Sequence, residues 1–178
     1  MSKQRKKSEK CTGFPPIAAP DARVLVLGSM PSVASLAKGQ YYGHPQNAFW
    51  PIMGRLFGAG PELPYDERKT TLVSYRVAVW DVLQSCRREG SLDTAIHRDS
   101  ELANDFATFL REQRQIGFIC FNGQKAETAF RRHVLASLAV LEREFRYERL
   151  PSTSPAHAGR SFEDKLAAWQ VVRRAVSG

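Results

Sequence analysis

The sequence predicts an α/β protein built around a four-stranded, mainly parallel sheet that is covered by helices on both sides. The first observation behind this is that strand-length segments alternate along the chain with segments of helical spacing. The second is that most of the strand-length segments are uniformly apolar, as expected for parallel strands buried on both faces. The expected strands are Arg23–Gly28, Val77–Trp80, Ile116–Phe121 and Phe145–Leu150.

The first strand leads into an unusual loop and then a helix. The apolar run Val24–Leu27 is followed by Gly28-Ser29-Met30-Pro31-Ser32, which cannot continue a strand because Pro31 lacks a backbone donor. A long loop rich in Gly, Tyr, His, Pro, Gln and Asn follows. From Asn47 to Phe57 the apolar residues recur with helical spacing, and Gly58 ends the pattern.

The middle of the chain contains the second strand between helical segments. Asp66–Tyr75 is an expected helix, and Val77–Trp80 is an apolar strand followed directly by Asp81. We expect Leu83–Asp93 to be a helix and then a loop. Asp99 or Ser100 is the expected cap of a further helix that runs to Gln113. That helix would bury Leu102, Phe106 and Phe109.

The last third repeats the alternation of strand and helix. Ile116–Phe121 is the third strand, and a helix is expected from Gly123 to about Ala136. The alternating segment Phe145–Leu150 predicts a more exposed fourth strand. Pro151–Gly159 is a loop, and Phe162–Val176 is the final helix, with Trp169 on its core face.

Composition predicts one domain, residues 14–178, preceded by a basic disordered arm, residues 1–13. The first ten residues carry five basic side chains and one acidic one, which is half of the net charge of +8. The arm is either a solvated tail or a phosphate-binding segment. The chain shows no apolar run long enough for a membrane span and no secretory signal. Three scattered cysteines form neither a disulfide framework nor a metal motif, so we expect a cytoplasmic or otherwise intracellular protein.

Three loops with polar side chains follow strands and are expected to converge. They are residues 28–46, Asn122-Gly123 and Pro151–Gly159. In a parallel sheet the carboxyl ends of the strands lie at one edge, so these loops can line a single cleft. The third loop has three hydroxyl side chains, two prolines and a histidine, and its hydroxyl and backbone N–H groups suit phosphate oxygens.

The ordered motifs GSMPS, YYGHPQNAFW, FNGQKA and LPSTSPAHA resemble the uracil-DNA glycosylase superfamily, and most closely its hypoxanthine-DNA glycosylase branch. The resemblance covers about Arg23 to Gly178 and implies a three-layer α/β/α sandwich. Members of this family extrude a damaged base from DNA and hydrolyse its N-glycosidic bond. It implies damaged DNA as the partner, a monomer, no metal or organic cofactor, and no lyase step. The alternatives are a uracil or mixed-specificity glycosylase and, in another class, a non-catalytic binder of single-stranded nucleic acid.

The resemblance also implies a role for each motif residue. Asn47 is the expected catalytic side chain, because Met30 stands where mismatch-specific relatives have the asparagine that orients the water. Tyr42 is expected to stack on the extruded base. The expected base-binding residues are Gly28, Ser29, Met30, Pro31, Tyr42, His44, Phe121 and Asn122. The expected DNA-binding residues are Ser32, Gly123, Lys125, Ser152, Thr153, Ser154, Pro155, His157 and Arg160.

Several of these residues also have a purely structural interpretation. Asn47 could cap the helix that follows it. One of Tyr41 and Tyr42 is expected in the core, because adjacent side chains point apart. His44 could brace its loop. Asp81 could cap a helix or line the cleft, and we favour the cap.

Overall fold

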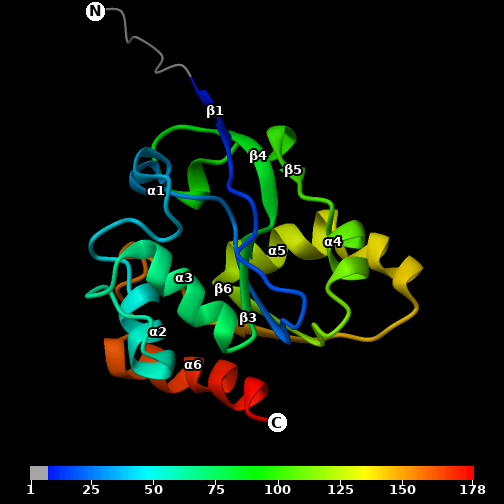
Figure 1. The fold of residues 1–178 in the computed structure, drawn as a ribbon. Coiled ribbons are helices and arrows are strands. Elements are labelled where there is room, and N and C mark those ends of the chain that lie inside the picture. Colours follow the sequence, from blue (N-terminus) through cyan, green and yellow to red (C-terminus); the bar gives the residue numbers. More distant parts are fainter. Residues whose placement is uncertain (1–7) are drawn as a thin grey trace, which may run out of the picture.

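The computed structural model describes residues 8–178 and contains a central sheet of four parallel strands (Figure 1). Their order across the sheet is β3-β2-β6-β7, and every neighbouring pair is parallel. The strands are β2 (Val24–Gly28), β3 (Val77–Asp81), β6 (Phe118–Asn122) and β7 (Arg146–Leu150). All four strands expected from the sequence are therefore present. The edge strand β7 is the most exposed of them, as its alternating pattern predicts.

Helices cover both faces of this sheet, which confirms the expected three-layer α/β/α sandwich (Figure 1). One layer consists of α2 (Phe49–Phe57), α3 (Tyr65–Ser74) and α6 (Phe162–Val176). The other consists of α4 (Phe106–Glu112), α5 (Gln124–His133) and the 3₁₀ helix η3 (Leu135–Leu141). No helix in residues 8–178 is long and apolar enough to cross a membrane.

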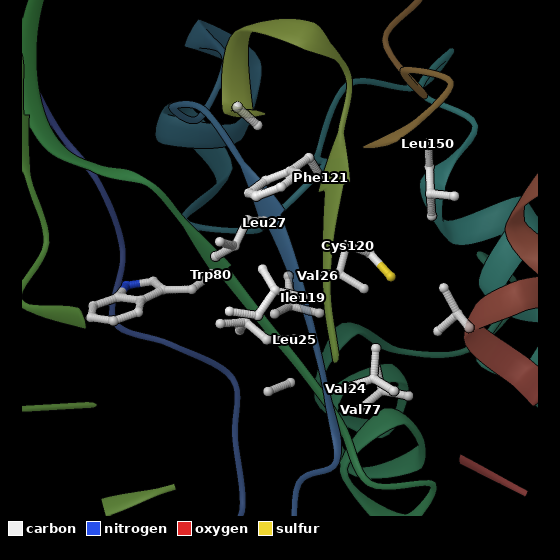
Figure 2. Close-up of a cluster of buried hydrophobic side chains, with 14 of the residues drawn as sticks. Val24, Leu25, Val26, Leu27, Val77, Trp80, Ile119, Cys120, Phe121 and Leu150 are labelled. Atoms are coloured by element: carbon white, nitrogen blue, oxygen red, sulfur yellow. The ribbon is translucent and has the colours of Figure 1, made fainter. Parts of the chain in front are cut away.

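The uniformly apolar strands are buried because each of their faces meets a helical layer. Figure 2 shows Val24, Cys120 and Leu150 on the α6 side of the sheet and Leu25 and Leu27 on the opposite side. Burial of such side chains stabilises the fold by roughly 1.5–3 kcal/mol each. This core holds the carboxyl ends of the strands, and thus the loops that follow them, in fixed positions.

A second sheet, not expected from the sequence, packs beside the first. It contains β1 (Glu9–Thr12), β4 (Leu83–Arg88) and β5 (Leu102–Ala103) in the antiparallel order β1-β4-β5. The helix expected from Leu83 is therefore wrong. Leu83–Arg88 pairs with a strand from the end of the segment expected to be a disordered arm, so the arm is also wrong for residues 9–12. Gly13 is also ordered, since its backbone N–H donates to the Gln84 carbonyl at 2.8 Å. Residues 1–7 of the expected arm lie outside the described chain.

The helix expected to start at Asp99 or Ser100 begins later. Asp105 is the cap of α4, since its carboxylate accepts from the backbone N–H of Thr108 at 3.0 Å. The residues before it form the one-turn 3₁₀ helices η1 (Asp93–Ala95) and η2 (Arg98–Ser100) and then β5. Leu102, expected to be buried, is 54% exposed.

The loop after β2 contains a short helix that its composition does not predict. α1 (Val33–Lys38) starts at Ser32, whose hydroxyl accepts from the backbone N–H of Ser35, and ends at Gly39 with φ of 64°. This helix lies next to the strand ends, so Ser32 is held by the cap rather than by an irregular loop.

The topology places a crevice at the carboxyl ends of β2 and β6. From β2 the chain passes to β3 on one side, and later returns to β6 on the other side of β2. The connections that leave β2 and β6 therefore diverge at this edge, which is where open α/β sheets bind ligands.

Candidate active site

A cavity of about 320 Å³ lies at this edge of the sheet, lined by the three loops that the sequence predicts to converge. Its volume is in the range typical of small-molecule sites. Most of the predicted site residues line it, namely Gly28, Ser29, Met30, Pro31, Ser32, Tyr42, Asn47, Asn122, Ser152, Thr153, Ser154 and His157.

The other predicted residues lie outside the cavity. Phe121 is 1% exposed and packs against Phe130 of α5 with ring centroids 5.1 Å apart, so it lies behind the cavity rather than in its lining. His44 braces its own loop, because its Nδ1 accepts from the backbone N–H of Gln46 at 3.1 Å. Pro155 and Arg160 are exposed beside the cavity on the loop after β7.

Hydrogen bonds join the three loops into one unit. The Asn122 amide donates to the Thr153 hydroxyl and accepts from the Thr153 backbone N–H, both at 2.9 Å. The Thr153 carbonyl in turn accepts from the backbone N–H of Ala48 at 2.9 Å. Gly123 makes the close approach possible, since its φ is 93° and a Cβ there would lie 3.0 Å from the Cβ of Ser152. Asn122 therefore braces the site, with both atoms of its amide already engaged.

Asn47 lies just before α2, and only the oxygen of its side-chain amide makes a hydrogen bond among residues 8–178. Its Oδ1 accepts from the backbone N–H of Phe49 at 2.9 Å. The N-cap of α2 is Ala48, so the cap expected at Asn47 is one residue too early, although Asn47 does bond to the first turn of the helix. This bond fixes the orientation of the amide, because only oxygen can accept from an N–H. Among residues 8–178 the Nδ2 group has no hydrogen-bond partner, and Asn47 lines the cavity. A neutral donor is therefore available there.

The two adjacent tyrosines divide as expected. Tyr41 is buried, and its hydroxyl donates to the Pro15 carbonyl at 2.9 Å. Tyr42 lines the cavity and stacks on Phe49 with centroids 3.9 Å apart and an interplanar angle of 22°. Its backbone has a positive φ of 53°, a conformation uncommon for residues other than glycine. Its buried hydroxyl lies close to Asn122 but makes no hydrogen bond within the described residues.

Two acidic residues line the cavity and a buried arginine lies near them, a set that the sequence pattern undervalues or misses. Asp81 ends β3, is 4% exposed and lines the cavity, and no helix follows it, so the interpretation as a cap is wrong. Asp93 lines the same space and accepts from the Ser29 hydroxyl at 2.7 Å. Arg88 is buried and donates to the Pro31 carbonyl at 2.6 Å. The available signal was an acidic residue directly after a wholly apolar strand, at the same edge as the recognised motifs.

Burial dominates the electrostatics of this acidic side. Desolvation, reinforced by the negative charge of Asp93 and opposed by Arg88, raises the pKa of Asp81 to about 8. Desolvation also raises the pKa of Asp93, although its hydrogen bond from Ser29 and the charge of Arg88 act in the other direction. Asp81 is therefore mainly a neutral carboxylic acid at pH 7.

The loop after β7 is anchored at its base and exposed at its tip. The buried Lys165 of α6 donates to the carbonyl of His157 at 2.9 Å, and the Trp169 indole donates to the carbonyl of Pro151 at 3.0 Å. The hydroxyls of Ser152 and Ser154 accept from backbone N–H groups within the loop. Within residues 8–178 the two hydroxyl protons have no acceptor, so they can donate to phosphate oxygens.

A second groove continues from the cavity along the start of α5. It shares Asn122, Ser152 and His157 with the cavity and extends to Gly123 and Lys125. Lys125 forms an ion pair with Glu101, as do Arg132 and His133. Burial alone would raise the pKa of Glu101, but the hydrogen bonds from Lys125 and His133 outweigh it and lower that pKa. Much of the positive charge of Lys125 is therefore balanced inside the protein.

Comparison with known proteins agrees with this geometry. The family model of the uracil DNA glycosylase superfamily matches residues 15–173. The chain is 36% identical over 165 residues to a hypoxanthine DNA glycosylase of Methanosarcina acetivorans, covering 91% of this chain and 97% of the relative. A hypoxanthine DNA glycosylase of Methanosarcina barkeri is also 36% identical, over 66% of this chain and 73% of its own length.

The fold is likewise shared with a solved structure. A solution NMR structure from Methanosarcina acetivorans, solved as a candidate uracil DNA glycosylase, has a TM-score of 0.77 and 31% identity, covering 96% of this chain and all of its own. The sequence match spans the strands, the three loops and α6, so the chain belongs to the uracil DNA glycosylase superfamily.

Proposed function

We propose that the protein is a monofunctional DNA glycosylase that removes deaminated bases, chiefly hypoxanthine from deoxyinosine, and leaves an abasic site. The observation that carries this proposal is the cavity at the strand ends, where Asn47 presents an unused amide donor beside Tyr42. The relatives named hypoxanthine DNA glycosylases, similar to this chain over most of its length, support the choice of base.

Tyr42 is suited to hold an extruded base by stacking. A base in duplex DNA must leave the helix before an enzyme can act on its glycosidic bond. Phe49 covers one face of the Tyr42 ring, and stacking between a base and an aromatic ring is worth roughly 1–3 kcal/mol. A rigid ring also fixes the plane of the base, and with it the position of the anomeric carbon.

Asn47 is suited to stabilise the departing base. Cleavage of the glycosidic bond puts negative charge on the base and positive charge on the sugar. The Nδ2 group donates to a developing negative charge without any change of protonation. Since Oδ1 is held by Phe49, the geometry favours this donor role over the alternative in which the amide oxygen holds the water.

The arrangement of lysines supports a hydrolytic reaction without a lyase step. No lysine lines the cavity within residues 8–178. Lys125 is bound to Glu101, Lys165 to the His157 carbonyl and Lys38 to the Gly43 carbonyl. A Schiff base with the sugar would require a free amine at the anomeric carbon. Water is then the nucleophile, and the hydroxyls of the loop after β7 hold the flanking phosphates.

A uracil or mixed-specificity glycosylase is the second candidate, favoured by the likeness to a structure solved as a candidate uracil DNA glycosylase. Both candidates are tested with oligonucleotides that contain one hypoxanthine, uracil, xanthine or ethenoadenine. These are incubated with the protein and then treated with alkali to cut abasic sites. Fastest cutting at hypoxanthine supports the first candidate, and fastest cutting at uracil supports the second. Tight DNA binding without any cutting would instead support a non-catalytic nucleic-acid binder.

A further inference from the structure

The second sheet brings together two cysteines that are far apart in the sequence. Cys11 of β1 and Cys86 of β4 are direct partners in the antiparallel register of these two neighbouring strands (Figure 1). Residues that oppose each other directly project from the same face of a sheet. Cys86 belongs to the hydrophobic core and Cys11 packs against that core, so both side chains lie on the covered face. Both thiols are free.

The spacing of the two strands suits a disulfide. Gly13 and Gln84 continue the register by one residue, and the Gly13 backbone N–H donates to the Gln84 carbonyl at 2.8 Å, as in a hydrogen-bonded pair. Such pairs alternate with non-hydrogen-bonded ones, so Cys11 and Cys86 also form a hydrogen-bonded pair, with Cα atoms about 5.5 Å apart. Disulfides usually join Cα atoms about 4.4–6.8 Å apart. The strand spacing therefore already falls in the range that a disulfide needs.

The bond would still carry some strain, and β1 is the strand able to relieve it. Directly opposed Cβ atoms in a sheet lie about 4.5–5.5 Å apart, whereas a disulfide needs about 3.5–4.5 Å. β1 is a four-residue edge strand whose only sheet neighbour within residues 8–178 is β4, and its residues other than Cys11 are exposed. A small shift of β1 closes the gap. Because strained disulfides are reduced more easily than relaxed ones, this bond would be reversible.

The third cysteine lacks such a partner and provides an internal control. Cys120 lies on β6 in the central sheet and is fully buried. Its register partners on the two neighbouring strands are Val26 and Glu148. No cysteine therefore stands opposite Cys120 in the sheet.

Thiol–disulfide exchange would begin at the more accessible thiol. Cys11 is half-buried, whereas Cys86 is 1% exposed, and burial raises the pKa of the Cys86 thiol to about 11. The Cys11 thiolate attacks one sulfur of a small-molecule disulfide, which forms a mixed disulfide and releases one thiolate. The Cys86 thiolate then attacks the Cys11 sulfur, which forms the Cys11–Cys86 bond and releases the second thiolate. The external disulfide thus takes up two electrons, and the protons lost by the two cysteines pass to the released thiolates.

We propose that Cys11 and Cys86 form a reversible disulfide that fastens β1 to β4 when the protein meets a small-molecule disulfide. Neither cysteine lines the cavity at the strand ends, so this site is separate from that cavity and does not depend on the proposed function. The bond closes a loop of about 75 residues, and closing a long loop restricts the unfolded chain. Oxidation is therefore expected to stabilise the fold.

The test incubates the folded, full-length protein with glutathione disulfide. The reaction is quenched with acid, free thiols are blocked in denaturant, and linked peptides are mapped by mass spectrometry. A peptide pair joined through Cys11 and Cys86 is expected, with Cys120 blocked as a free thiol, and dithiothreitol is expected to reverse the link. The thermal midpoint of the oxidised protein is expected to exceed that of the reduced protein by about 5–10 °C.

Variants of the three cysteines identify the source of the stabilisation. Cys120→Ala is the matched control and is expected to keep both the link and the rise in thermal midpoint on oxidation. Cys11→Ser and Cys86→Ala are expected to lose both. Cys86 is a core residue, whereas Cys11 is half-buried on an edge strand, so Cys11→Ser keeps the test decisive if Cys86→Ala does not fold.

Three results would contradict the inference. The first is a mixed disulfide of glutathione with Cys11 that never passes to Cys86 at any ratio of oxidised to reduced glutathione. The second is a Cys11–Cys86 link that forms only in urea, since the folded register would then not bring the thiols together. The third is a linked protein with an unchanged thermal midpoint, because the bond would then not fasten β1 to β4.

Discussion

The residues of the cavity fall into a neutral group and an acidic group, which differ in how fully their polar atoms are hydrogen-bonded. On one side, Asn47, Asn122 and Thr153 are neutral, and hydrogen bonds to the backbone or to one another fix each of them. On the other side, Asp81 and Arg88 are buried charged-type side chains with polar atoms that lack partners in the described chain. On the neutral side, the Asn47 Nδ2 group is still without a hydrogen-bond partner among residues 8–178. On the acidic side, Asp81 Oδ2 and two nitrogens of Arg88 are buried without a partner among the same residues, which costs stability.

The first prediction concerns the free energy of unfolding on the acidic side. The pKa of Asp81 is raised in the folded protein to about 8 from an ordinary value of 3.8, so the folded state holds a proton that the unfolded state has released. The favourable contribution is complete below pH 3.8 and is lost as the pH rises through about 8. Asp81→Asn removes this loss. Its thermal midpoint is expected to exceed that of wild type by a margin that grows from about pH 4 to pH 8. A constant margin would mean that Asp81 is ionised in the folded protein.

The second prediction concerns catalysis on the neutral side. Asn47→Ala removes a donor to developing charge, which typically costs about 2.7–4 kcal/mol, or roughly 100- to 1000-fold in single-turnover rate. Loss of the bond to Phe49 adds a stability cost of about 1 kcal/mol. Asn47→Asp still accepts from Phe49 but has no amide donor, so it is expected to fold well and excise slowly. Gln46→Ala, at the exposed neighbouring amide, is the matched control. Wild-type turnover in Asn47→Ala would leave only the structural role.

The third prediction concerns the Tyr42 ring, which lines the cavity and stacks on Phe49. Tyr42→Ala is expected to lose about 1–3 kcal/mol of base binding, the usual worth of a stacked base. Tyr42→Phe keeps the ring and removes a hydroxyl that has no protein partner, so it is expected to retain most excision. Excision kinetics at several enzyme concentrations measure both variants. Equal losses in the two would show that the hydroxyl, and not stacking, is what matters.

The fourth prediction concerns the brace that satisfies the neutral side. Asn122→Leu leaves the backbone N–H and the hydroxyl of Thr153 without their partner, at an expected cost of about 1–3 kcal/mol in the free energy of unfolding. Thr153→Val removes only the hydroxyl bond and is expected to cost less. Denaturant unfolding of both single variants and the double variant gives their coupling. Strictly additive effects would show that the two side chains do not act as one unit.

The smallest effect is expected at the exposed tip of the loop after β7. Replacing His157 and Arg160 with Ala is expected to weaken binding of damaged duplex more than it slows excision at saturating enzyme. The slope of log affinity against log salt is expected to fall by about 1 for each phosphate contact that is lost. Arg174→Ala, at an exposed arginine at the end of α6, is the control for general loss of charge. Unchanged duplex affinity would exclude this loop as the DNA-probing segment.

The neutral and the acidic residues of the cavity also differ in how well the sequence predicts them. The central strands and α6 were predictable because local periodicity already encodes burial on one face or two. The neutral side was predictable because its residues stand in contiguous motifs. The second sheet was not, because Leu83–Arg88 reads as a strand only once residues 9–12 are known to pair with it. Asp81 was undervalued because an acidic residue after a strand normally signals a cap, and only the packed fold shows that it is enclosed.

The hydrogen bonds of Thr153 to Ala48 and Asn122 also have a consequence for synthesis of the protein. A chain made from its N-terminus produces the strand β2 and the entrance of α2 long before it produces the loop after β7. Until Thr153 has left the ribosome, the Ala48 N–H and the Asn122 amide have no partner from that loop. The nascent chain therefore carries Asn47 and Tyr42 before the loop after β7 exists, and the cavity is complete only after the last strand has joined the sheet.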